Sequence, residues 1–216
     1  MKKTFLSLIV LVLLVATINA QNSATDIAKK VADAYGFTNF KNAKAMTFTF
    51  NVKRDTTVSF RSWNWNIADN IVTMTTLKET VTYKRDTIQT AAMKSVDQKF
   101  INDQYWLIFP FHLIWDSGST LTTKENQLSP ISKKEQTMLT VQYNNKDGYT
   151  PGDAYDLYLD NKYMITEWSY RKGGAEKPSL STTWQDMQTM KGLNIATNHK
   201  SADGKFSIYF TGVTVK

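Results

Sequence analysis

The sequence predicts an α+β fold: a large curved antiparallel β-sheet, forming an incomplete barrel, with an N-terminal helix and a helical, apolar insertion. Three observations predict this class. Apolar and polar residues alternate from Met46 to Lys53, as they do in a half-buried strand. Residues 87–115 lose that alternation and are first helix-like and then strongly apolar. Residues 138–215 return to short β-rich segments that turn residues separate.

The N-terminus has the composition of a secretory signal peptide. A cationic start precedes an apolar run from Phe5 to Ile18, and Ala20 closes the cleavage site. The run is shorter than the roughly 20 apolar residues that a permanent transmembrane helix needs. We therefore expect a signal peptide over residues 1–20, cleavage after Ala20, and a single β-rich domain over residues 21–216. This predicts a periplasmic protein, and whether it also leaves the cell stays open.

The mature chain is expected to begin with a helix. Apolar residues recur at helical spacing over residues 24–35, after a capping pattern at Ser23 and before Gly36. The apolar residues of the following segment change parity near Ser62, which predicts a β-bulge there. The expected strands of this region cover residues 46–52, 58–65, 71–77 and 80–83.

The middle of the chain is expected to hold a second helix and then an irregular apolar segment. Apolar residues recur every four positions from Ile88 to Phe100, which predicts a helix over residues 87–102. Residues 105–115 are the most hydrophobic of the mature chain, and Pro110 forbids a regular helix through their centre. Two interpretations of this segment stay open: a lid over a cavity, or a buried crossover.

The C-terminal half is expected to be a meander, in which consecutive strands pair as antiparallel neighbours. The turn Asp160-Asn161 joins two strands into a hairpin, and Gly173-Gly174 and Asp203-Gly204 mark further turns. The expected strands cover residues 138–143, 153–159, 163–170, 180–190, 193–199 and 206–215. The whole chain should therefore have about ten strands.

Size and charge exclude several classes of protein. The mature chain is long enough to bury about 70% of its unfolded surface, so it needs no covalent staples. It has no Cys, which excludes disulfides, a lipid-modified cysteine and thiolate metal sites. The formal net charge of +7 falls by two with the signal peptide, and the remaining cations are scattered among acids. We therefore expect a solvated surface, no nucleic-acid partner and a monomer.

Few residues have the types and spacing that catalysis needs. The two histidines, His112 and His199, have no zinc-motif partners, and the glycine motifs of nucleotide sites are absent. Residues 143–154 resemble a calcium loop only in part, because its first and last ligand positions hold Tyr143 and Ala154.

Three carboxylates of the predicted hairpin, Asp153, Asp156 and Glu167, are the candidates for acid–base chemistry on a sugar. Asp153 and Asp156 are three positions apart and therefore point to opposite faces of a strand, which favours ordinary solvated side chains. We expect no metal, no cofactor and no catalytic residue.

The sequence Lys-Arg-Asp-Thr occurs at residues 53–56 and again at 84–87, each time after a strand-like segment. Paired Arg54 and Arg85 would make an anion site, but polar strand ends followed by turns explain the repeat more simply. The offset does not recur, which excludes a solenoid.

Aromatic residues are the strongest functional signal. The chain has 6 Trp, 10 Tyr and 11 Phe. Most are expected in the core, but a concave sheet lined with Trp and Phe also makes a slot for acyl chains. The candidate wall and lid residues are Trp63, Trp65, Trp106, Phe109, Phe111 and Trp115.

In plan, the chain resembles the periplasmic outer-membrane lipoprotein carriers and their relatives, the LolA-like, LolB-like and LppX-like proteins. The resemblance rests on the leader, the first helix, the Phe-rich strand at 46–52, the insertion near 87–115 and the hairpin over Tyr155–Ile165. It implies an incomplete barrel whose mouth is covered by helices around an apolar cavity. It also implies a lipid or other hydrophobic small molecule as partner, with a lipoprotein or another envelope component as a second partner.

The resemblance further implies an arginine that hydrogen-bonds to the lid, and Arg54, Arg61 and Arg85 all stay open for that role. The superfamily shape also hosts a cofactor-free enzyme, so the shape alone does not fix function. Three hypotheses remain. A binding protein or carrier requires a cavity, a cofactor-free enzyme requires His112 or His199 beside a carboxylate at a cavity wall, and a structural envelope protein requires no continuous cavity.

Overall fold

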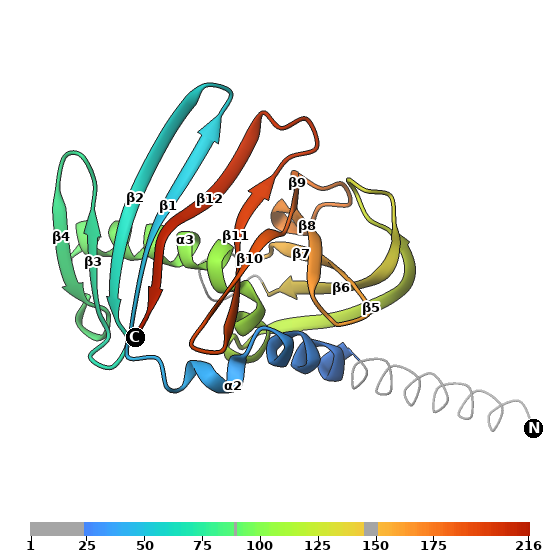
Figure 1. The fold of residues 1–216 in the computed structure, drawn as a ribbon, viewed down its shortest axis with the longest axis horizontal. Helices are drawn as coiled ribbons and strands as arrows, with labels where there is room; N and C mark the ends of the chain where they lie inside the picture. Colours follow the sequence, from blue (N-terminus) through green and yellow to red (C-terminus); the bar gives the residue numbers. More distant parts are fainter. Residues whose placement is uncertain (1–23, 89, 145–150) are drawn as a thin grey trace, which may run out of the picture.

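The computed structural model describes residues 24–88, 90–144 and 151–216. Two antiparallel sheets dominate it (Figure 1), which confirms the predicted α+β class with a curved antiparallel sheet. The predicted signal peptide over 1–20, the capping residue Ser23 and the middle of the calcium-like loop lie outside the described residues. No helix in the described ranges is both long and apolar enough to cross a membrane.

The first sheet has seven strands. They are β1 (Ala45–Arg54), β2 (Thr57–Asn66), β3 (Ile71–Thr75), β4 (Thr80–Lys84), β10 (Gln185–Met190), β11 (Leu193–Lys200) and β12 (Phe206–Val215). Their order across the sheet is β10-β11-β12-β1-β2-β3-β4, so the first and last strands of the chain pair with each other. On β1, Met46, Phe48 and Phe50 are buried on one face, as the alternation predicts.

The predicted β-bulge near Ser62 is wrong. Strands β1 and β2 pair without a register shift from Ala45–Asn66 to Arg54–Thr57. Trp63 of β2 faces the core, whereas Val58 and Phe60 lie on the opposite face and are 49% and 39% exposed. The apolar residues therefore change face while the backbone stays regular.

The second sheet has five strands in sequence order, which confirms the predicted meander for residues 138–183, whereas the later strands belong to the first sheet. They are β5 (Ser119–Leu128), β6 (Glu135–Tyr143), β7 (Ala154–Leu159), β8 (Ile165–Arg171) and β9 (Leu180–Thr183). Strands β7 and β8 form the predicted hairpin, and the Asp160 side chain accepts the backbone N–H groups of Lys162 and Met164 in its turn. Sequence reasoning missed β5, because Leu121 is its one buried residue.

The segment predicted as one strand over 180–190 is two strands. The chain leaves the five-stranded sheet at Trp184 and enters the seven-stranded sheet with β10. Such a corner lets one continuous segment contribute to both layers. The described residues thus hold twelve strands in two sheets instead of about ten in one.

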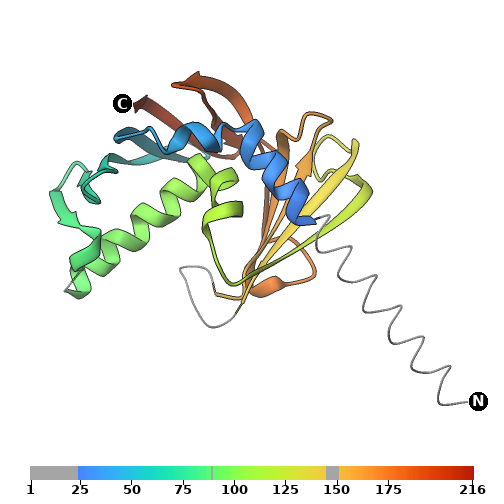
Figure 2. The ribbon, with the colours of Figure 1, turned by 90° about the horizontal axis from the view of Figure 1, so that it is seen from below.

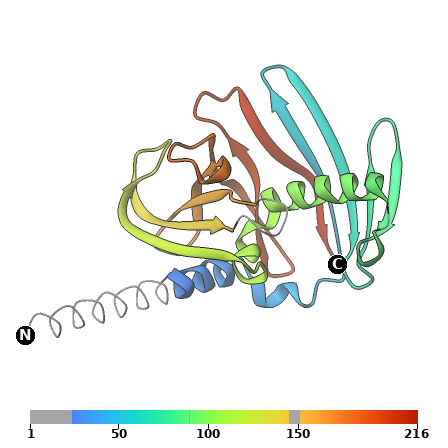
Figure 3. The same ribbon diagram turned by 180° about the vertical axis from the view of Figure 1, so that it is seen from behind.

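Helix α3 (Ala91–Trp115) crosses the inner face of the seven-stranded sheet (Figure 3). Thr90 caps it by accepting the N–H of Met93 at 3.1 Å. The helix predicted over 87–102 extends to Trp115, and the prediction that no regular helix runs through the centre of 105–115 is partly right, because a kink at Ile108 (φ −129°, ψ 27°) interrupts it. Pro110 has no N–H to give to the carbonyl of Trp106, which accounts for the break.

The N-terminal helix over residues 24–34 and the short α2 (Phe37–Phe40) lie where the two sheets meet (Figure 2). Tyr35 joins both sheets: its hydroxyl accepts the N–H of Ile165 on β8, and its carbonyl accepts the N–H of Asn194 on β11. Gly36 separates the two helices at φ +83°, where a side chain would meet the Gly192 carbonyl.

Candidate ligand-binding site

Helix α3 is fastened to β2 by an ion pair. The Arg61 guanidinium donates to both carboxylate oxygens of Asp103, at 2.8 and 2.6 Å, and the Trp63 indole N–H donates to the same carboxylate at 2.8 Å. Burial raises the pKa of Asp103, and Arg61 opposes that effect. The hydrogen bond to Asp103 in turn raises the pKa of Arg61. The pairing fixes the height of α3 over the sheet.

A second ion pair holds the N-terminal part of α3. Arg85, which follows β4, donates to Asp97 at 2.7 Å, and the hydroxyl of Tyr83 donates to the same carboxylate at 3.0 Å. Arg54 lies elsewhere, with its guanidinium 5.5 Å from the centre of the Phe206 ring. The repeated Lys-Arg-Asp-Thr segments therefore do not bring Arg54 and Arg85 together, and both segments lie at strand ends.

With α3 in this position, the inner face of the seven-stranded sheet is covered. The rings of Trp63 and Trp65 each lie 5.4 Å from Phe100 of α3, centre to centre. Phe109 and Phe111 are fully buried beyond the kink. Trp115 is 38% exposed and packs against Phe40 of α2 at 4.8 Å. These side chains are held by one another and by α3.

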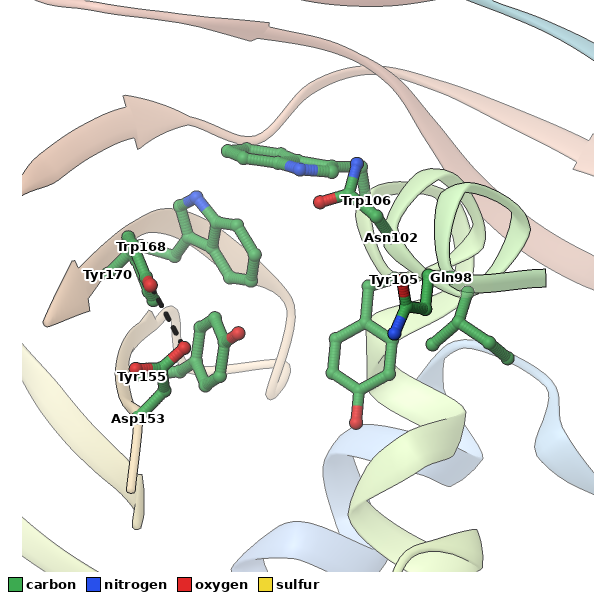
Figure 4. Close-up of a pocket in the computed structure, with 9 residues that line it drawn as sticks. Gln98, Asn102, Tyr105, Trp106, Asp153, Tyr155, Trp168 and Tyr170 are labelled. Carbon is green, nitrogen blue, oxygen red and sulfur yellow. Dashed lines mark hydrogen bonds between the residues drawn. The ribbon is translucent and has the colours of Figure 1, made fainter. Parts of the chain in front are cut away.

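A cavity of about 510 Å³ lies between α3 and the β7–β8 hairpin. Figure 4 shows residues of α3 on one side and residues of the hairpin facing them. The lining residues are Gln98, Ile101, Asn102, Tyr105, Trp106, Asp153, Tyr155, Trp168 and Tyr170. The volume is within the range of about 300–1,000 Å³ that small-molecule sites have.

The aromatic part of the wall is continuous. Trp106 meets Trp168 edge-on at 4.5 Å, and Tyr155 stacks on Trp168 at 5.2 Å. Tyr170 lies 5.4 Å from Tyr155, and Tyr105 closes the wall at 6.2 Å from Tyr155. Residues from two elements far apart in sequence thus form one aromatic surface.

The polar part of the wall comes from both sides. Gln98 and Asn102 lie one turn apart on α3, and the Asp153 carboxylate lies opposite, just before β7 (Figure 4). Asp153 accepts the Tyr170 hydroxyl at 2.9 Å and the N–H of Gly173 at 2.7 Å. Burial, and then the hydrogen bond to Asp153, raise the pKa of Tyr170 to about 12.

A buried hydrogen-bond network supports the wall behind Tyr105. The hydroxyls of Tyr105 and Tyr143 both donate to one oxygen of Asp116, and the Nδ1 atom of His112 lies 2.9 Å from the other. Burial raises the pKa of Asp116, but the bonds from His112 and the two tyrosines outweigh it and hold that pKa below its usual value. In Figure 4 the Tyr105 hydroxyl points away from Trp106.

His199 is fully buried behind the other side of the wall. Its ring lies 4.1 Å from Trp184 and 5.5 Å from Trp106. Burial lowers the pKa of His199 to about 3, and the backbone groups of Thr183 and Trp106 oppose this only in part. His199 is therefore a neutral core residue at ordinary pH.

Asp153 and Asp156 are separated, as their spacing predicts, but the expectation of solvated side chains is wrong for Asp156 and Glu167, which are buried. Asp153 lines the cavity, whereas Asp156 pairs with Arg171 at 2.8 Å. Glu167 is buried and accepts the backbone N–H groups of Ile131 and Ser132. Across the three described ranges, no group of three His, Asp or Glu side chains is placed to hold a metal ion.

One of the six aromatic residues proposed from the sequence, Trp106, lines the cavity. The other five pack around α3 and its C-terminal end. Sequence reasoning missed Tyr155, Trp168 and Tyr170, although their alternation in the hairpin could have found them. Tyr155 pairs with Tyr170, and neighbours at a spacing of two share a face with them.

Comparisons with known proteins bear on the fold. No protein-family model matches the sequence, and no curated protein matches it. A solved DUF1329 family protein from Desulfovibrio piger is similar with a TM-score of 0.54 and 8% identity, covering 91% of this chain and 93% of that one. A LolA superfamily protein from Nitrosomonas europaea gives 0.49 and 8%, covering 89% and 93%. At 8% identity, the likeness to the DUF1329 family protein is one of fold alone.

Proposed function

We propose that this protein binds a lipid or another small hydrophobic ligand in the cavity between α3 and the β7–β8 hairpin, as a binding or carrier protein. The observation that carries the proposal is the aromatic wall itself. Five aromatic side chains surround about 510 Å³ of space that no protein atom fills. Burying apolar ligand surface there would yield about 25 cal/mol for each Å² removed from water.

The wall is built to keep its shape without a ligand. Two ion pairs hold α3 above the sheet, and the Asp116 network holds Tyr105 from behind. A site that is already ordered does not spend binding energy on ordering its side chains. This supports binding over a purely structural role, for which no continuous cavity is needed.

The covered inner sheet suggests how a larger ligand would be held. Trp63 and Trp65 are covered by Phe100, so the slot expected from the sequence is occupied by α3. If α3 is a lid, its withdrawal would add this second aromatic surface to the cavity. Arg61 and Arg85, but not Arg54, are placed to act on such a lid. We place the protein in the periplasm on the strength of its N-terminal sequence.

The enzyme hypothesis has one observation in its favour. His112 lies within hydrogen-bond reach of Asp116, at 2.9 Å. His112 is not among the residues that line the cavity, however, and Tyr105 stands between them. The pair therefore supports the wall, and we do not assign it an acid–base role.

The proposal can be tested on the mature protein, purified from its own envelope without detergent. Native mass spectrometry should find a bound lipid, and titration with a fluorescent fatty acid should give saturable binding. Trp106→Ala should weaken that binding about tenfold or more, since buried tryptophans dominate binding energy. Phe60→Ala, on the outer face of the sheet, is the matched control and should leave affinity unchanged. A bare protein that also does not bind the fatty acid would overturn the proposal.

A further inference from the structure

We infer that the polar group recognised in this cavity is an organic cation of the quaternary ammonium class. The inference rests on the proposed site and names the chemistry of the ligand's head. Its first support is charge. The nine described residues that line the cavity include one carboxylate, Asp153, and no lysine, arginine or histidine. In a chain of formal net charge +7, a cavity whose one charged side chain is an acid favours a cationic head group over an anionic one.

Among the described residues, no cation is paired with the Asp153 carboxylate. Its hydrogen-bond donors in that part of the chain are the Tyr170 hydroxyl and the Gly173 N–H, and both are neutral. These bonds fix the direction of the carboxylate, and a cation in the cavity would supply the charge that the protein does not.

The aromatic wall selects the kind of cation. Ring faces attract a cation, and the aromatic rings that line this cavity lie 4.5 to 6.2 Å apart, centre to centre. A metal ion needs several oxygen ligands, whereas this wall offers one carboxylate. A quaternary ammonium carries its charge on methyl groups, needs no hydrogen-bond acceptor, and sheds water easily. Carboxylate plus rings therefore match this class better than a metal or a primary amine.

The amide side chains place the rest of the ligand. Gln98 and Asn102 stand one helical turn apart on α3, across the cavity from Asp153. Amide groups donate as well as accept hydrogen bonds, so they suit an ester, hydroxyl or phosphate oxygen next to the ammonium. The ammonium could belong to a lipid headgroup or to a free small molecule, and the test separates these sources.

The test begins with the wild-type mature protein, so it needs no variant to fold. Tryptophan fluorescence and calorimetry would compare choline with 3,3-dimethylbutanol, its neutral isostere. Choline should bind at least about tenfold more tightly, because the isostere lacks the charge. A single-chain phosphocholine lipid is then compared with its phosphoglycerol counterpart. Tighter binding of the phosphocholine lipid than of choline identifies a lipid headgroup, and equal binding identifies a small free cation.

Asp153→Asn supplies the second arm. It should weaken choline binding about tenfold without weakening binding of the fluorescent fatty acid, whose carboxylate the Asp153 charge disfavours. Asp203→Asn, on an exposed turn, is the control. Equal binding of choline and dimethylbutanol would overturn the inference, as would an Asp153→Asn variant with wild-type choline affinity. If choline binding fails these tests but the fluorescent fatty acid still binds, the cation inference is wrong and the proposed function is not. Failure of the inference can therefore be distinguished from failure of the proposed function.

Discussion

The guanidinium of Arg61 on β2 forms two hydrogen bonds with the carboxylate of Asp103 on α3, at 2.8 and 2.6 Å. Asp103 is fully buried, and the guanidinium of Arg61 compensates the charge of its carboxylate. The pairing joins β2 to α3 through two residues that are 42 positions apart in sequence. It is therefore a tertiary contact that fixes where α3 lies, and with it one wall of the cavity.

Removal of Arg61 should be costly. Arg61→Ala would leave the Asp103 carboxylate buried without its cation, and the expected loss in unfolding free energy is about 3–5 kcal/mol. Arg54→Ala is the matched control, because Arg54 is the last residue of the neighbouring strand β1 and its guanidinium lies over the Phe206 ring. This substitution should lower the unfolding free energy by less than about 1 kcal/mol. Urea denaturation measures both. Equal effects of the two substitutions would mean that the ion pair does not hold α3.

How far the sequence predicts this structure depends on the range of the interactions involved. The alternation on β1 and the Asp160-Asn161 turn are local patterns, and both were sufficient to predict their elements. Strand β5 is polar on both faces near its exposed end, so it has no apolar period to detect. The sheet exchange at Trp184 leaves no mark either, because the two strands on either side of it are both extended.

The candidate site likewise has a part that local sequence patterns predict and a part that depends on long-range contacts. The sequence predicts Trp106 as a ligand contact, but the hairpin rings that complete its wall lie about 50 to 65 positions later in the chain, and no local spacing connects the two. Trp63 and Trp65 carried an equal aromatic signal, yet Phe100 covers them. Composition shows how many aromatic residues are available, while α3 packing decides which of them border a cavity.

Gly36 should tolerate no side chain. A Cβ at Gly36 would lie 2.0 Å from the Gly192 carbonyl oxygen, whereas a Cβ at Gly204 would meet nothing within 4 Å. Both glycines have positive φ, so Gly204→Ala should cost only the backbone strain of about 1–2 kcal/mol. Gly36→Ala should cost about 1–3 kcal/mol more, because the backbone of β11 must move. Thermal unfolding of the two variants measures the difference, and equal melting temperatures would contradict the close approach.

His199 should make the protein sensitive to mild acid. Its pKa is about 3 in the folded protein and about 6.5 when unfolded, so between these values only the unfolded chain takes up the proton. Stability is therefore complete above pH 6.5 and falls as the pH drops. At pH 4.5 the expected loss is about 2–3 kcal/mol.

The His199→Phe variant should remove that contribution. Its unfolding free energy should decline less than that of the wild type between pH 7.5 and 4.5, measured by urea denaturation at each pH. Lys200→Gln, at an exposed position on the same strand, should follow the wild-type curve. Parallel curves for wild type and His199→Phe would mean that the histidine is protonated in the folded protein.

Asp116 should also lose its stabilising contribution as the pH falls, but at lower pH than His199. Its folded-state pKa is held below the ordinary value, so its contribution is present above about pH 3.9 and is lost as the pH falls through the folded pKa. Asp116→Asn at pH 7 should cost about 1.5–3 kcal/mol, the value of hydrogen bonds to a charged group. Asp26→Asn, at a 67% exposed side chain, is the control and should be nearly neutral. Because Tyr105 belongs both to this network and to the cavity wall, Asp116→Asn should also weaken fatty-acid binding; unchanged affinity would mean that the wall keeps its shape without the network.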